Sequence, residues 1–253
     1  MRVFNYNVKD IDFPFEKNPH DADCILVGGG DGSLLHSIQW IDKHTLWNVP
    51  VLGYNLGHVG FLSNDLTEEQ LYAILKDTRH ERAIEKRNIL FIMEGVFSHE
   101  NNKGHVALNE VVIQPQRLGK LFEVTVSFPN DHRVDDIEYK GDGLIISTAS
   151  GSTAYNLSAG GPIMHPSVKG LVMTPICPFS LAARPIVIPL DTFDTHLIIK
   201  TKQPALFVID GEPFPFEEDE INIKVSLEKL KLLKYTNFFD AIRNKLGWND
   251  SIK

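Results

Sequence analysis

The sequence is poor in the features that mark secreted, metal-binding and membrane-spanning proteins. It has only two cysteines, Cys24 and Cys177, which favours free thiols in a reducing compartment over a disulfide framework. It has no CxxC or HExxH pattern, so we expect no dedicated protein metal site. No apolar run approaches the roughly 20 residues of a membrane span, and the first residues lack an apolar signal segment. These absences predict a cytoplasmic protein.

Positive charge is also scarce. The chain has 33 acidic residues against 25 Lys and Arg, a formal net charge of −8, and no basic run. This balance argues against nucleic acid or an anionic membrane surface as the main partner. The nucleophile pattern GxSxG of many hydrolases is missing as well. With 253 residues and 43% hydrophobic content, the chain is large enough for one large or two small domains.

The most informative motif is DCILVGGGDGSLL at residues 23–35. Residues 24–27 are apolar without alternation, which predicts a fully buried strand. A glycine turn follows, and from Ser33 the apolar residues recur with the period of a helix. A strand, a glycine turn and a helix N-terminus together present backbone N–H groups and the positive end of the helix dipole to an anion. The motif therefore predicts a site for phosphate groups.

Asp31 is the unusual residue of this turn, because a carboxylate repels phosphate. It needs a role such as binding magnesium, holding the turn, or orienting or deprotonating a hydroxyl group. The alternative is that Asp31 only caps the following helix together with Ser33. The dinucleotide-binding fingerprint does not fit, because its third glycine would fall on Ser33, and the P-loop pattern fails for lack of a Lys at the right position.

The first part of the chain alternates strands and helices. A short strand at 49–54 runs into a second glycine loop, and Thr67 and Gln70 have capping-box spacing for the helix after it. We therefore expect a small parallel, Rossmann-like α/β domain over residues 1–86. Its ligand loops should follow the carboxyl ends of its strands.

The remainder of the chain has many short strands separated by turn residues. This pattern predicts a mainly antiparallel, β-sandwich-like domain over residues 87–236. Residues 237–253 should form a helix that packs back on the first domain, with Phe239, Ile242 and Leu246 on its apolar face and Gly247 as its stop. The expected strands are 89–97, 107–114, 122–128, 133–139, 144–148, 186–188, 196–200, 205–209, 221–225 and 230–235.

Two further stretches of the second part carry polar residues where a core would not need them. Residues 140–166 hold many hydroxyl side chains around several glycines, which suits a pocket for a polar ligand; a Ser/Thr-rich turn with a helix cap is the favoured alternative. Asn109 and Glu110 interrupt an apolar strand expected at 106–113. Neighbours on a strand face opposite sides, so at most one of the pair should face the core unless a bulge re-aims them. The alternative for this pair is a solvated edge.

Five ordered stretches together resemble the NAD kinase family. They are GGGDGSLL at 28–35, GYNLGHVGFL at 53–62, ALNEVVI at 107–113, GDGLIISTASGSTAYNLSAGGPIMHP at 141–166 and MTPICPFSLAARPIVIP at 173–189. GGDG alone also fits lipid kinases and phosphofructokinases, so the ordered set carries the resemblance. It implies an α/β domain and a β-rich domain with the active site in the crevice between them. It also implies phosphorylation of the 2′-hydroxyl of the adenosine ribose of NAD, usually by ATP, and assembly as a homodimer or homotetramer.

The resemblance also implies roles for individual residues. Asp31 would be the catalytic carboxylate, and Phe61 would pack near the NAD. Asn109 and Glu110 would bind ribose or phosphate-side groups, and Asp142 would contact the far nucleoside. A divalent metal such as Mg²⁺ would remain bound largely to phosphates and water. The other expected nucleotide-binding residues are Gly29, Gly30 and Gly32 beside the phosphates, Ser150, Thr153, Ala154, Tyr155 and Ser158 around the adenine and nicotinamide, partly across a subunit interface, and Lys140 and Asp210.

Three residues depart from the usual family pattern: Phe179 stands in place of a His, Ala149 in place of a Pro, and Glu212 in place of a Gln. The segment before Gly28 is also shorter than the usual first strand and helix. Two alternative functions stay open, a kinase of another hydroxyl acceptor such as a lipid or sugar, and a non-catalytic sensor of NAD or NADP. The phosphoryl donor, ATP or polyphosphate, is open as well.

Overall fold

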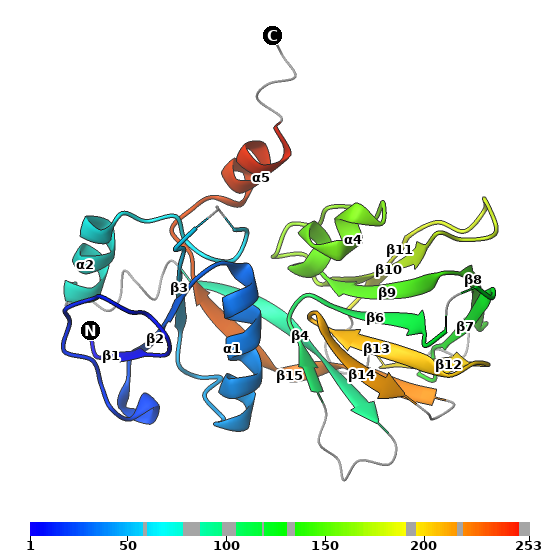
Figure 1. Cartoon of the computed structure of the whole chain (residues 1–253), viewed down its shortest axis with the longest axis horizontal. Coiled ribbons are helices and arrows are strands. Elements are labelled where there is room, and N and C mark those ends of the chain that lie inside the picture. Colours follow the sequence, from blue (N-terminus) through cyan, green and yellow to red (C-terminus); the bar gives the residue numbers. More distant parts are fainter. Residues whose placement is uncertain are drawn as a thin grey trace. The chain divides into compact units, whose positions relative to one another are not determined.

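The computed structural model describes residues 1–57, 60–77, 87–97, 105–117, 119–130, 135–190, 196–216 and 220–247. The chain divides into two compact units, whose elements are labelled in Figure 1. The first unit comprises Met1–Leu90 and Lys229–Lys253, and the second comprises Phe91–Glu228. The end of the chain therefore belongs with its beginning. Strand β15 (Glu220–Leu233) starts in the second unit and ends in the first.

The first unit is built on a parallel sheet. Strand β2 (Cys24–Gly28) lies between β1 (Val3–Asn5) and β3 (Val51–Tyr54), and Leu232 near the end of β15 pairs with Val51. Every residue of β2 is buried, which explains why its sequence is apolar without alternation. A short 3-10 turn, η1 (Pro19–Asp21), precedes β2.

Two helices of the first unit follow the glycine turn and the second loop, as expected. Helix α1 (Asp31–Lys43) follows β2 after two residues (Figure 1). It buries Leu34, Ile38 and Ile41. The predicted capping box of α2 (Glu68–Lys76) is confirmed, since both of its hydrogen bonds between Thr67 and Gln70 form.

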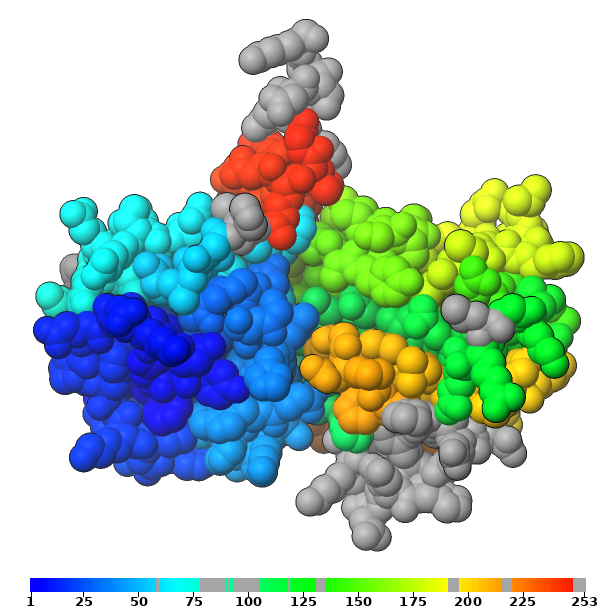
Figure 2. Space-filling model, viewed as in Figure 1, coloured from blue at the N-terminus to red at the C-terminus, as the bar shows by residue number. Residues whose placement is uncertain are grey.

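Helix α5 (Phe238–Leu246) ends at Gly247, as expected, but its buried face differs from the prediction. Gly247 has a φ of 66°. Ala241 and Ile242 are buried, whereas Phe239 is 55% exposed, so the prediction that Phe239 faces the core is wrong. Figure 2 shows α5 in red at the surface of the first unit. Within the described ranges, no helix is long and apolar enough to cross a bilayer.

The second unit is a sandwich of two antiparallel sheets. In one sheet β15 pairs with β12 (His196–Thr201), β12 with β7 (Phe122–Ser127), and β7 with β8 (Ile137–Gly141). The other sheet has the order β11 (Ile186–Pro189), β10 (Gly170–Ile176), β9 (Gly143–Thr148), β6 (Glu110–Pro115), β13 (Ala205–Ile209) and β14 (Glu212–Phe216). Buried side chains of both sheets form one core cluster that includes Phe122 and Phe207. The predicted fold class is confirmed.

Several strand predictions need correction. The strand expected at 107–114 is two strands, β5 (His105–Ala107) and β6, and the strands expected at 221–225 and 230–235 are the single strand β15. Strand β4 (Arg87–Phe97) pairs with β5 and β15. The start of the strand expected at 133–139 lies outside the described residues, and β8 begins at Ile137.

Strands β10 and β14 were not predicted, and both contain proline. Strand β14 holds Pro213 and Pro215 and lies at the edge of its sheet, where a missing N–H is tolerated. In β10, the pairing with β11 ends at Met173, so Pro175 has only β9 as a described neighbouring strand. Proline rules out a strand only where hydrogen-bonded neighbours lie on both sides of it.

Candidate functional site

The carboxylate of Asp31 is the centre of a hydrogen-bond cluster in the first unit. Asp31 is the first residue of α1, and its Oδ2 accepts a hydrogen bond from Phe61 N at 2.6 Å. Its Oδ1 accepts three bonds, from Leu62 N at 3.1 Å and from the N and Oγ atoms of Ser63 at 3.0 Å each. A carboxylate has about four lone-pair positions, two on each oxygen. Oδ1 is therefore saturated, while Oδ2 keeps one lone pair for another partner.

This arrangement ties the start of α1 to the loop after β3. The bonds of Asp31 go to residues 61–63 and none of them caps α1, whose N-cap residue is Gly30. The alternative of a simple helix cap shared by Asp31 and Ser33 is therefore wrong.

Two glycines make the close packing around Asp31 possible. Gly29 has a φ of +115°, and a side chain there would also collide with Ser33. A Cβ atom on Gly60 would overlap the carboxylate of Asp31. By contrast, the positions of Gly30 and Gly32 open onto free space, which leaves the first turn of α1 accessible to a ligand.

Two lysines from the end of the chain complete this cluster, and the sequence analysis missed both. Lys234 Nζ donates to Ser63 O at 2.6 Å and to Leu62 O at 3.3 Å. Burial lowers the pKa of Lys234 to about 8, an effect that the charge of Asp31 opposes and the charge of Lys245 reinforces. Lys245 Nζ lies 4.6 Å from the centre of the Phe61 ring, in cation–π geometry. No local motif signals either lysine, since Lys234 is 171 positions from Ser63.

In the second unit, Asp210 plays a comparable part. It lies in the two-residue turn between β13 and β14, where Ile209 pairs with Glu212. Asp210 has a φ of 48° and Gly211 a φ of 93°, as a tight hairpin turn with two left-handed residues requires. The Asp210 carboxylate accepts hydrogen bonds from three consecutive backbone N–H groups, those of Leu108 at 2.7 Å, Asn109 at 2.8 Å and Glu110 at 3.1 Å.

These bonds explain why the expected strand breaks at Asn109. The N–H groups of 108–110 turn toward Asp210, so β5 ends before them and β6 begins at Glu110. Asn109 is 6% exposed and Glu110 8% exposed. Both side chains are buried, so the alternative of a solvated edge is wrong, and Asn109 lies outside the strand on which the expectation of opposite faces was based.

Three buried oxygens beside Asp210 have no hydrogen-bond partner among the described residues. They are Asn109 Oδ1, Glu110 Oε2 and Ser150 Oγ. Burial, and then the charge of Asp210, raise the pKa of Glu110 to about 8. Burial raises the pKa of Asp210 to about 6, against the opposing effect of its three backbone bonds. Near pH 7 Glu110 therefore keeps its proton and has a donor as well as an acceptor to offer a ligand.

Most hydroxyl groups of residues 140–166 stabilise the backbone. Ser152 Oγ donates to Ala149 O at 2.7 Å and accepts from Met164 N at 2.9 Å, and Thr148 Oγ donates to Leu108 O at 2.6 Å. Asn156, which the sequence analysis did not single out, is buried at the centre of this stretch: its Nδ2 binds Ser152 O and Pro162 O, and its Oδ1 accepts from Thr174 Oγ. The favoured alternative, a structural turn, thus describes these hydroxyls.

The structure brings some of the expected site residues together and separates others. Ser150 lies next to Asn109, because Gly151 packs against the backbone of Asn109 and Thr148 N donates to Asn109 O. Thr153 is in η2 (Gly151–Thr153), Ala154 follows it, and Tyr155 and Ser158 are in α4 (Tyr155–Ser158). Tyr155 is 40% exposed.

Asp142 and Lys140 lie at the opposite end of the β6–β9 ladder from this group. Glu110 pairs with Ser147 and Ile113 with Leu144, so five residues, roughly 16 Å, separate Ser147 from Asp142 along the strand. Lys140 Nζ is bound to Glu123 at 3.3 Å. Within one copy of the second unit, these two residues form a separate group.

The packing of Gly60 against Asp31 leads to a prediction. A Gly60→Ala variant should lose roughly 1–3 kcal/mol of unfolding free energy, because its Cβ atom has to displace the carboxylate or the loop. Gly57→Ala is the matched control, since a Cβ atom there meets no atom within 4 Å. Urea unfolding measures the difference, and equal losses in both variants would contradict the described packing.

The raised pKa of Glu110 leads to a second prediction. Its stabilising contribution should be complete below its ordinary pKa of 4.5 and should be lost as the pH rises through about 8. The free energy of unfolding of the unmodified chain should therefore fall, between pH 5 and 8, relative to that of Glu110→Gln. Denaturant titrations across this range test it, with the exposed Glu212→Gln as control. Parallel curves for Glu110→Gln and the unmodified chain would show that Glu110 ionises normally.

Known families match both units of the chain. The ATP-NAD kinase N-terminal domain matches residues 9–83, and the ATP-NAD kinase C-terminal domain matches residues 108–235. The NAD kinase of Methanothermobacter thermautotrophicus is 37% identical over 241 residues, which cover 92% of this chain and 80% of that protein. The NAD kinase of Treponema denticola is 34% identical over 253 residues, covering 98% and 86%.

Solved structures give the same result. A yeast NADH kinase complexed with NADH superposes with a TM-score of 0.78 at 27% identity, over 94% of this chain and 71% of that one. An NAD kinase from Archaeoglobus fulgidus in complex with ATP has a TM-score of 0.70 at 26% identity, over 92% and 85%. From its domain matches, its relatives and its fold, the chain belongs to the NAD kinase family.

Proposed function

We infer that this chain is an NAD kinase, which transfers a phosphoryl group from ATP to the 2′-hydroxyl of the adenosine ribose of NAD. The main support is the carboxylate of Asp31. Four hydrogen bonds hold it in place, and one lone pair of Oδ2 stays open for a substrate hydroxyl. Phosphoryl transfer to a hydroxyl group asks mainly for positioning and charge neutralisation. A rigid carboxylate beside an accessible helix N-terminus supplies the positioning.

In this proposal the first unit performs the chemical step. Asp31 Oδ2 accepts the hydrogen of the 2′-hydroxyl and takes its proton as the new O–P bond forms and the bond to ADP breaks. Gly29, Gly30 and Gly32 let phosphate oxygens approach the first turn of α1, and the open space at Gly30 and Gly32 supports this role. Phe61, held at Asp31 by its own N–H group, packs near the NAD.

The second unit provides the binding groups. Asn109 and Glu110 bind ribose or phosphate-side groups, which would satisfy the two oxygens that are buried without partners. Asp210 positions both residues through their N–H groups. Asp142 contacts the far nucleoside, and Lys140 is a further nucleotide-binding residue. The adenine and nicotinamide pockets are lined by Ser150, Thr153, Ala154, Tyr155 and Ser158.

The described residues fit a divalent metal that arrives with the nucleotide. They contain no group of three or more His, Cys, Asp or Glu side chains able to hold an ion. Mg²⁺ usually keeps its phosphates and several waters and needs only one or two carboxylates. The one open lone pair of Asp31 Oδ2 is used by the 2′-hydroxyl, so such an ion would be held by the phosphates and water. When bound, the metal neutralises charge on the phosphates.

We also propose that the chain assembles as a homodimer or homotetramer and works in the cytoplasm. Two observations support the assembly: Tyr155 is exposed, and Asp142 is far from Asn109 within one copy. A second copy would bring its own Tyr155 and Asp142 to the ligand at Asn109. The two free thiols support a reducing compartment: Cys24 is buried, and Cys177 is exposed after β10 with a φ of 42°.

The catalytic role of Asp31 is tested by Asp31→Asn. With NAD, ATP and Mg²⁺, NADP formation should fall roughly 100-fold or more, because an amide does not take the proton. The amide NH2 group can also face Phe61 N, which is itself a donor, and this would disturb the loop. Binding of NAD is therefore measured as well, to separate a lost proton acceptor from a displaced loop. Ser63→Ala, which removes one hydrogen bond to the same carboxylate, reports the effect of the loop alone. Asp12→Asn, an exposed acid of the same unit, should keep full activity.

The results separate the possible functions. Wild-type turnover in Asp31→Asn would remove Asp31 from the chemistry. Tight binding of NAD without product, for ATP and polyphosphate as donors and for several metals, would identify a non-catalytic sensor. Turnover of ATP only with a lipid or sugar acceptor would identify a different kinase.

The assembly leads to its own prediction. If Tyr155 completes the site of a neighbouring copy, specific activity should fall when the protein is diluted until light scattering reports monomers. Tyr155→Ala should weaken NAD binding while the monomer stays folded, because Tyr155 is 40% exposed. Full activity in a solution of monomers would contradict the proposal.

A further inference from the structure

The second unit contains a cavity of about 500 Å³ that the proposed reaction does not use. It lies between the turn that joins β6 to β7 and the turn that joins β12 to β13. Strand β6 runs from Glu110 to Pro115, so the cavity is at the end of β6 opposite Asn109, roughly 17 Å away. Its lining residues are Pro115, Gln116, Arg117, Lys120, Leu121, Phe122, Gln203 and Pro204. Figure 2 shows the neighbouring β13–β14 region in orange beside green residues of the same unit.

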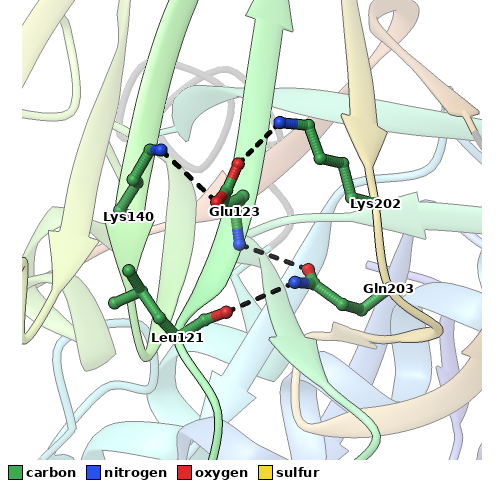
Figure 3. Close-up of polar contacts among 5 residues, drawn as sticks. All are labelled: Leu121, Glu123, Lys140, Lys202 and Gln203. Carbon is green, nitrogen blue, oxygen red and sulfur yellow. Dashed lines mark hydrogen bonds and ion pairs between the residues drawn. The ribbon is translucent and has the colours of Figure 1, made fainter.

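Hydrogen bonds fix the walls of this cavity. Gln116 N donates to Pro204 O at 3.1 Å, and Gln116 Nε2 donates to Ala205 O at 3.0 Å. On the other side, Gln203 Oε1 accepts from Glu123 N and Gln203 Nε2 donates to Leu121 O, each at 3.3 Å (Figure 3). Both turns are therefore held in place before any ligand arrives, which lowers the entropic cost of binding.

The cavity carries uncompensated positive charge. Arg117 and Lys120 form no ion pair with the described residues, and both are exposed to solvent. The nearby carboxylate of Glu123 is already shared by Lys140 at 3.3 Å and Lys202 at 2.7 Å (Figure 3). It does not neutralise the two cations of the cavity. Such a local excess of positive charge contrasts with the net charge of −8 of the whole chain.

The rest of the lining is apolar. Pro115, Leu121 and Pro204 supply hydrocarbon surface, and Leu121 is 44% exposed. Pockets of this size that combine apolar walls with a few polar groups are typical of small-ligand sites. Arg117 offers a planar fork of donors and Lys120 a point charge, which suit a carboxylate or a phosphate.

We propose that this cavity binds a small organic anion, with an apolar or aromatic body against Leu121 and Pro204 and a carboxylate or phosphate monoester group between Arg117 and Lys120. A carboxylate and a phosphate both accept charge-assisted hydrogen bonds from Arg and Lys, so the proposal covers both groups. The cavity is distinct from the group formed by Asn109, Glu110 and Ser150. Its occupancy is independent of whether the chain phosphorylates NAD.

The test is a calorimetric titration of the full chain with phenyl phosphate and with benzoate, and with benzyl alcohol as the uncharged probe. At least one anion should bind with a dissociation constant on the order of 1 mM or tighter, as expected for so small a molecule. Benzyl alcohol should bind at least ~10-fold more weakly. Binding of phenyl phosphate alone would assign a phosphate ligand, and binding of benzoate alone a carboxylate ligand.

Variants then locate the binding. Arg117→Gln with Lys120→Gln should weaken anion binding at least ~10-fold, since both charged donors are lost. Lys169→Gln with Lys224→Gln changes the net charge of the same unit equally, at two exposed positions away from the cavity, and should leave binding within about twofold. Saturating NAD and ATP should not displace the anion.

Nuclear magnetic resonance of the unmodified chain gives an answer that does not depend on any variant. With saturating NAD and ATP present, phenyl phosphate should shift the backbone amide signals of Gln116, Leu121 and Phe122, and leave those of residues 30–33 in place. Three results would overturn the proposal: equal losses in the two double variants, displacement of the anion by NAD or ATP, or benzyl alcohol binding as tightly as both anions.

Discussion

A carboxylate that accepts three consecutive backbone N–H groups determines the local structure around the key polar residues in each unit. In the first unit Asp31 holds the N–H groups of Phe61, Leu62 and Ser63, and in the second unit Asp210 holds those of 108–110. The carboxylate satisfies N–H groups that would otherwise need partners in a helix or a sheet, so regular secondary structure is interrupted at 61–63 and at 108–109. The same geometry leaves side chains free to serve a ligand.

The surrounding residues are arranged to allow these two anchors. Gly60 provides room for the carboxylate of Asp31, and Lys234 binds the carbonyl groups of the same loop from its other side. Gly211 permits the tight turn that presents Asp210. The two neighbouring carboxyl groups have different pKa values. Burial raises the pKa of Glu110 to about 8, so it stays protonated near pH 7. Burial raises that of Asp210 only to about 6, because its three backbone bonds favour the charged form.

Local patterns in the sequence predicted the two-part fold and many of its elements. The apolar run at 24–27, the helical period after Ser33 and the capping box of Thr67 all depend on neighbours within a few positions, so periodicity and capping rules detect them. Strands β10 and β14 were not predicted, and the places of their prolines are explained only by the assembled sheet: β14 is an edge strand, and Pro175 lies beyond the pairing of β10 with β11. The partnership of Lys234 with Ser63 joins residues far apart in the sequence and carries no local signal. The break at Asn109 likewise depends on Asp210, which lies 101 positions away.

The two cysteines differ sharply in chemical reactivity. Burial in β2 raises the pKa of Cys24 to about 12, so its thiol is both shielded and protonated near neutral pH. Cys177 is exposed at the turn after β10. A thiol-directed dye or spin label would therefore attach to one defined position of the second unit without any engineered residue. The unmodified chain thus offers a built-in reporter site from which distances to a labelled nucleotide can be measured in solution.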